Sequence, residues 1–311
     1  MEFPQTAGEG VFIDLQTDFE DGDASATARY LPVGIMRPAV IKWLDRSIVS
    51  GQVLSGSGVV RGPLRDFPFH KTHSGRFEVF FQTEELLLDY WPEWPALQKA
   101  SADVRFLGNS FDTWIRHARL ADNRITGAHG RIRDLKRTSP FELGVQTDGA
   151  IRNILNLLRN SPLSKDFGSM TELLEVGGEA SLRLNLAIPI TDGSPFQLAG
   201  KLNLRDAILE LPDSPLTISS IRGALHFDHE SVRAQAIEGL LFGNPLSVDV
   251  ETLDGEPRIS RVMARGAING TQLAGLASDP SWNLFRGTGN WRLQLDIPSR
   301  SASCRFPGTG S

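Results

Sequence analysis

The stretch EASLRLNLAIPI, residues 179–190, decides the fold class because its apolar and polar side chains alternate. Its even positions are Ala180, Leu182, Leu184, Leu186, Ile188 and Ile190, whereas its odd positions include Ser181, Arg183 and Asn185. Successive side chains of a β-strand point to opposite faces of a sheet. This period of two therefore predicts a strand with one apolar face.

The same alternation recurs along most of the chain. It is found around residues 11–15, 77–81, 198–208, 246–250 and 291–297. Clusters of Gly, Asp and Pro such as TDGSPF and LDGEPR separate these runs and are typical of short turns. We expect a mainly β protein with an elongated, twisted antiparallel sheet. If the apolar side of this sheet stays open it forms a groove that needs a ligand, whereas a sandwich or barrel would cover it.

About three short helices are expected between the strands. The segment RPAVIKWLDRSIVSG has Pro38 near its start and Gly51 after its end, with Val40, Trp43, Leu44 and Ile48 on one face. The other two helices are predicted in DGAIRNILNLLRNSP and NGTQLAGLASDP. The acidic stretch DFEDGD, residues 18–23, is typical of a hairpin turn.

A possible internal repeat relates two parts of the chain, at about residues 100–160 and 221–280. Phe106 and Phe227 stand in similar surroundings 121 residues apart, and the same offset leads from Asp148-Gly149 to Asn269-Gly270. A sheet-plus-helix unit that repeats is typical of elongated, additive architectures. We expect one β-rich segment over residues 1–298, followed by a polar tail, residues 299–311, that is disordered or out of frame.

Composition excludes some classes of function. The net charge of -5 and the pI near 5.7 give no general attraction for nucleic acid. The only cysteine, Cys304, cannot form an internal disulfide. Residues 1–31 lack the features of a secretory signal, and no window has the roughly 18 apolar residues that a bilayer span requires.

The segment FPFHKTHSGRFEVFFQTEELLLDYWPEWPAL, residues 67–97, is the main candidate for chemistry. His70 and His73 have no further Cys or His nearby to complete a zinc site, so we expect turn residues and no metal. The carboxylates between Glu84 and Asp89, with Trp91 and Trp94, would fit a carbohydrate-active enzyme, although tryptophans before prolines more often serve packing. No nucleophile elbow or P-loop occurs, so we expect neither catalysis nor a cofactor.

The order of several sequence blocks carries a family resemblance. The chain contains GVVRGPLRDFPF, GRFEVFF, LLLDYWPEWPAL, ADVRFLGN, LAIPI, GALHFDHE, FGNPLSV and ARGAINGTQLA in this order. In this order of blocks, residues 1–298 resemble the AsmA-like superfamily, in particular the YhdP-type proteins. The FPF and YWPEWP blocks are the most specific parts of the resemblance.

The resemblance implies a segment, incomplete at both ends, of an inner-membrane-anchored and periplasm-spanning protein of Gram-negative bacteria. It implies an open hydrophobic groove that carries phospholipid between the inner and outer membranes, with a role in outer-membrane biogenesis. The membrane anchor would belong to the missing N-terminal part. The candidate residues for contact with phospholipid acyl chains are Leu182, Leu184, Leu186, Ile188, Leu202 and Leu204. A structural or partner-binding β scaffold is the first alternative, and a carbohydrate-active enzyme is the second.

Overall fold

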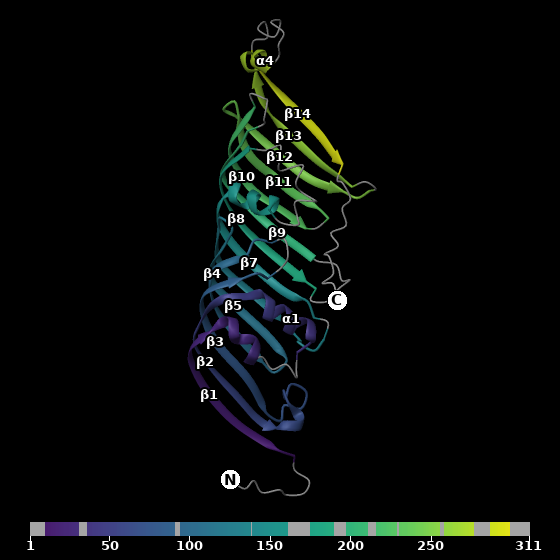
Figure 1. The fold of residues 1–311 in the computed structure, drawn as a ribbon. Coiled ribbons are helices and arrows are strands. Elements are labelled where there is room, and N and C mark those ends of the chain that lie inside the picture. Colours follow the sequence, from purple (N-terminus) through teal and green to yellow (C-terminus); the bar gives the residue numbers. More distant parts are fainter. Residues whose placement is uncertain are drawn as a thin grey trace.

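The residues that the structure describes form a single antiparallel sheet of fourteen strands, which Figure 1 draws as a ribbon. A computed structural model describes residues 10–30, 36–90, 94–137, 139–160, 175–189, 197–210, 216–228, 230–255, 258–276 and 287–298. The strands are β1 (Phe12–Asp23), β2 (Ile48–Pro63), β3 (Arg76–Leu88), β4 (Leu97–Leu107), β5 (Ser110–Leu120), β6 (Asn123–Ile132), β7 (Phe141–Ala150), β8 (Glu175–Ile188), β9 (Gln197–Glu210), β10 (Thr217–Asp228), β11 (Val232–Leu241), β12 (Asn244–Leu253), β13 (Ile259–Asn269) and β14 (Thr288–Pro298).

The strands lie in the sheet in the same order as in the sequence, from β1 at one edge to β14 at the other. Every neighbouring pair is antiparallel, and the sheet is not closed into a barrel. Figure 1 shows an elongated, curved and twisted sheet whose strands follow one another along its long axis. The predicted mainly β, antiparallel architecture is therefore confirmed.

Bulges concentrate toward one end of the strands. Glu85, Lys99, Ser220 and Ala236 have φ between 50° and 53°, and each lies at a shift of the pairing register. A bulge bends its strand and increases the local twist. The bulges therefore help to curve the sheet at the end of the strands from which the helices emerge.

The described residues contain three α-helices: α1 (Pro38–Ser47), α2 (Ile151–Arg159) and α4 (Gly270–Leu276). They follow β1, β7 and β13, so among the described residues a helix recurs after every six strands and always at the same end of the strands. Two short 3-10 helices, η1 (Ala24–Tyr30) and η3 (Leu64–Asp66), complete the described elements.

The sequence-based boundaries were wrong at two places. Ile48 does not extend the first helix but begins β2, where it pairs with Leu88. Residues 18–23 are not a hairpin turn but the second half of β1, which pairs with β2. The predicted tail, residues 299–311, and Trp91 lie outside the described residues.

The second and third helices are held to the sheet in corresponding ways. The buried side chain of Asn123, at the turn between β5 and β6, donates a hydrogen bond to the carbonyl of Asn153 on α2 (3.0 Å). At the turn between β11 and β12, Asn244 donates to the side-chain oxygen of Gln272 on α4 (2.7 Å). These asparagines are 121 residues apart, the offset of the predicted repeat.

Candidate functional site

The pairing register divides the side chains into two faces of opposite character. One row of residues that face each other across β7–β14 is apolar except for its first member: Thr147, Leu182, Leu202, Leu225, Ala234, Val250, Val262 and Leu295. The adjacent row is polar throughout: Gln146, Arg183, Lys201, His226, Arg233, Glu251, Arg261 and Asp296. Since adjacent residues of a strand point to opposite sides, the sheet has an apolar face and a charged face.

The apolar face continues through the first half of the sheet. A second row crosses β1–β9 without a charged residue: Phe19, Gly56, Phe81, Val104, Thr113, Gly130, Leu143, Leu186 and Leu198. Because this row shares β7–β9 with the first, the apolar face extends from one edge strand to the other.

All six residues predicted to line a groove lie together on this apolar face. Leu182, Leu184, Leu186 and Ile188 come from β8, and Leu202 and Leu204 come from the adjacent β9. Leu182 is buried, with 5% of its surface exposed, whereas the other five are half-buried. The prediction did not include Leu225, Val250, Val262 and Leu295, which continue the face beyond β9. Apolar and polar residues alternate along these strands in the sequence, but this pattern does not show which residues face each other across neighbouring strands.

Helix α1 covers part of the apolar face near the first edge. Met36, Val40 and Leu44, in and just before α1, share a buried cluster with sheet residues that include Phe77 and Phe106. The indole of Trp43 donates a hydrogen bond to the carbonyl of Tyr90 (2.7 Å). This part of the face therefore serves as an ordinary hydrophobic core.

Helix α2 covers a second part of the face. It lies against β6, β7 and β8, and its residues Ile151 and Ile154 belong to the buried cluster that contains Ala180 and Leu182. The end of β8 that begins at Glu175 is thus the covered end. Residues closer to the opposite end of β8, such as Leu186, retain partial exposure.

The apolar face remains exposed at both edges of the sheet. Leu293, Leu295 and Ile297 on β14 expose 46%, 49% and 44% of their surface, and Leu15 on β1 exposes 50%. Contiguous exposed apolar surface is typical of a binding region. Together with the half-buried leucines of β8 and β9, these residues form the candidate binding surface.

The charged face is bound together by ion pairs between neighbouring strands. Arg261 on β13 and Asp296 on β14 form two hydrogen bonds of 2.8 and 2.9 Å. Glu78 pairs with Arg76 and with Arg105, the latter at 2.8 Å. Burial alone would raise the pKa of Glu78, but hydrogen bonds and charges from both arginines outweigh it and lower this pKa. Such a face is suited to contact with water.

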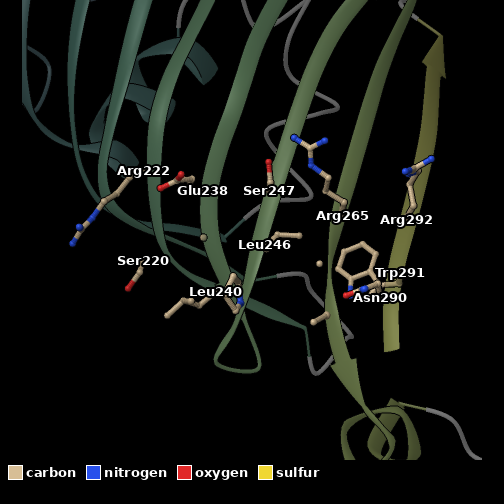
Figure 2. A pocket seen from close by; sticks show the side chains of 14 residues that line it. Ser220, Arg222, Glu238, Leu240, Leu246, Ser247, Arg265, Asn290, Trp291 and Arg292 are labelled. Atoms are coloured by element: carbon tan, nitrogen blue, oxygen red, sulfur yellow. The ribbon is translucent and has the colours of Figure 1, made fainter. Parts of the chain in front are cut away.

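A depression of about 990 Å³ lies between β10 and β14 (Figure 2). Arg222, Glu238, Ser247, Arg265 and Arg292 are among the residues that line it. These five follow one another in register, so they belong to the charged face. Its lining also includes Leu246, Gly266 and Trp291 of the apolar face, so the depression combines charged and apolar surface.

The residues considered for other chemistry lie apart from this surface. His70 and His73 lie in the connection between β2 and β3. Among the described residues, no three His, Cys, Asp or Glu side chains gather where they could hold a metal ion. The carboxylates Glu84 and Glu85 are exposed at the end of β3. Trp94 packs against Tyr90 with ring centroids 6.4 Å apart.

Comparisons with known proteins identify relatives of the chain. The family model described as YhdP protein matches residues 1–306. Over 246 residues the chain is 23% identical to the intermembrane phospholipid transporter YhdP of Escherichia coli (strain K12). The match covers 79% of this chain and 19% of that protein, so the chain spans a minor part of its relative. No solved structure matches the chain. None of the helices in the described ranges has the length and apolar character needed to cross a bilayer.

Proposed function

We propose, from the premise that this chain belongs to the YhdP family, that it is one segment of a conduit for phospholipid. The conduit would span the periplasm and let phospholipid move between the inner and outer membranes. Acyl chains would lie along the apolar face of the sheet, on Leu184, Leu186, Ile188, Leu202 and Leu204, next to Leu182, which α2 covers. The polar headgroups would stay at the open side, in contact with water.

One observation supports the proposal: the apolar face crosses every strand, and within the described part of the chain α1 and α2 cover only part of it. Hydrocarbon gains about 25 cal/mol for each Å² of apolar surface that is removed from water. Because leucine and valine recur on strand after strand, an acyl chain would find similar surroundings at each step. Movement along such a face needs no unique pocket and no chemical step.

The recurring helices support an additive construction. We propose that residues of about 100–160 and 221–280 are two copies of one unit, each with four strands and a terminal helix: β4–β7 with α2, and β10–β13 with α4. The equivalent contacts of Asn123 and Asn244 with their helices support this interpretation. A conduit made of such units can be lengthened without changing its cross-section.

The membrane anchor and the working location are also proposals. The full-length protein would be held in the inner membrane by a segment outside this chain, and this segment of the sheet would lie in the periplasm. Phospholipid acyl chains and, through that anchor, the membrane are the proposed partners. No nucleic acid and no cofactor take part in the proposal.

The test uses two charge substitutions on the apolar face, Leu184→Lys and Leu202→Glu. A charge on this surface would have to be desolvated by an acyl chain, which costs several kcal/mol. Lys201→Glu is the matched control, because Lys201 adjoins Leu202 in sequence but points to the charged face. Native mass spectrometry of the purified chain measures co-purified phospholipid, and a phosphatidylethanolamine with a photoreactive acyl chain measures crosslinking.

The expected result is that both apolar-face variants lose bound and crosslinked lipid, while the control retains them. Equal lipid in all of these proteins would refute the assignment of this face. A wild-type chain that carries no lipid and forms no crosslink would instead favour the structural or partner-binding scaffold.

A further inference from the structure

Four aromatic rings of the apolar face lie over glycines of a neighbouring strand. The pairs are Phe19 over Gly56, Phe141 over Gly130, Phe227 over Gly200 and Trp291 over Gly266. A Cβ atom on Gly200 would lie 2.7 Å from Cε2 of Phe227, and one on Gly130 would lie 2.6 Å from Cε2 of Phe141. Each of these rings therefore occupies space that any other residue would fill with its own side chain.

The register explains how the rings reach these glycines. Phe19, Phe227 and Trp291 stand directly opposite their glycines, whereas Phe141 lies diagonally from Gly130, beside Leu143. Side chains of a strand normally stand roughly perpendicular to the sheet. An absent side chain on the partner strand allows the ring to lean over and cover the backbone instead.

We infer that these glycines keep the lipid path open by letting the rings lie low on the floor of the apolar face. The inference rests on the proposed function and names the residues that set the clearance above the sheet. An upright phenylalanine would project into the space that an acyl chain needs. A leaning ring offers its flat side to the acyl chain as apolar surface and leaves that space free.

The pair of Gly200 and Phe227 is the most informative of the four. Gly200 lies between Leu184 on β8 and Phe227 on β10, and Phe227 faces Val232 on β11. Phe227 is half-buried, so part of the ring remains accessible. In contrast, Phe141 packs against Trp43 of α1, with ring centroids 6.0 Å apart, and lies in the covered part of the face.

A single added methyl group tests the inference. In Gly200→Ala, the new Cβ would displace the Phe227 ring away from the sheet. Gly149→Ala is the matched control, because Gly149 pairs with Ala180 on the same face but a Cβ atom added there would meet nothing within 4 Å. The double variant Gly200→Ala/Phe227→Ala removes the displaced ring and leaves the methyl group in place.

Lipid retention is measured by native mass spectrometry and by crosslinking to a phosphatidylethanolamine with a photoreactive acyl chain. Circular dichroism verifies that each variant is folded. Gly200→Ala should retain several-fold less lipid than the wild type, whereas Gly149→Ala should retain the same amount. The double variant should regain most of the lipid that Gly200→Ala loses. Wild-type binding by Gly200→Ala, or no recovery in the double variant, would overturn the inference and leave the proposed function standing.

A second variant keeps the test decisive if Gly200→Ala does not fold. At Gly266 an added Cβ would lie 3.0 Å from Cζ2 of Trp291 and 3.0 Å from the carbonyl oxygen of Pro245, so the ring would be displaced less than Phe227 (Figure 2 shows the Trp291 ring). Gly266→Ala should lower lipid retention by a smaller factor, and unchanged retention there would overturn the inference. If the wild-type chain itself carried no lipid, that result would contradict the proposed function as well.

Discussion

Leu182 on β8 lies directly opposite Leu202 on β9, yet only Leu182 is fully buried. Leu182 is a buried member of the cluster that contains Ile151 and Ile154 of α2, whereas Leu202 packs against this cluster and stays half-buried. Leu182→Ala should therefore lower the free energy of unfolding by about 2–5 kcal/mol, the range for large-to-small changes in a core. Leu202→Ala should cost clearly less. Urea denaturation of the two variants compares these costs, and equal losses would contradict the role assigned to α2.

Asn123 joins the turn before β6 to helix α2, and its loss should loosen the helix. Its side chain is 5% exposed and donates to the carbonyl of Asn153. Asn123→Ala leaves that carbonyl without this donor, which costs about 1–3 kcal/mol when the group stays buried. Asn185→Ala, an exposed change on the charged face, is the control. Circular dichroism during thermal unfolding measures the melting temperature of each variant. If the contact were unimportant, both substitutions would change the melting temperature by similar amounts.

Lys201 on β9 lies directly opposite a second cation, Arg183 on β8. Like charges directly opposite one another destabilise a sheet. Lys201→Glu should consequently stabilise the fold by about 0.2–1 kcal/mol. Because these groups are on a solvent-facing surface, the gain should shrink as salt is added. A melting temperature that falls, or a gain that does not depend on salt, would show that this repulsion is not the cause.

Glu78 gives the stability of the sheet a dependence on acid pH. Its pKa lies below the ordinary value in the folded protein because of Arg76 and Arg105. The stabilisation from ionised Glu78 is thus fully present above the unfolded pKa, about 4.3, and is lost as the pH falls through the lower folded pKa. Glu78→Gln should have a lower free energy of unfolding than the wild type at pH 7. Under acid conditions the free energies of unfolding of the two proteins should become equal. Glu20→Gln, at an exposed carboxylate of β1, is the comparison variant.

The alternation of the sequence predicts the strands and the apolar face well, because both depend on the local period of two. Leu182 and Arg183 point to opposite sides for this reason alone. The ends of elements were harder to predict, because partners distant in sequence decide them. Ile48 fits the helical pattern of α1, but its pairing with Leu88 draws it into β2. Phe19 and Glu20, read as turn residues, are held in β1 by Gly56 and Ser55.

The contacts across strands were beyond the reach of sequence patterns. From the sequence alone, Gly200 is an unfavourable residue within β9. The structure shows that it lies opposite Phe227, whose ring needs the space that a side chain would fill. The bulge at Ala236 shifts the pairing of β11 without any glycine to signal it. The number of residues in each turn, together with these bulges, decides which leucines become neighbours. That information is distributed over the whole chain.

Among the described strands, each one pairs with the strands just before and just after it in the chain. Contacts between sequence neighbours need little loop closure and form early. A newly made portion can therefore settle onto the growing edge before the remainder has emerged from the ribosome or a translocation channel. Very long proteins of this design would then fold from the N-terminus onward as the chain emerges. The strand at the growing edge would be the one that remains unpaired until the next strand is made.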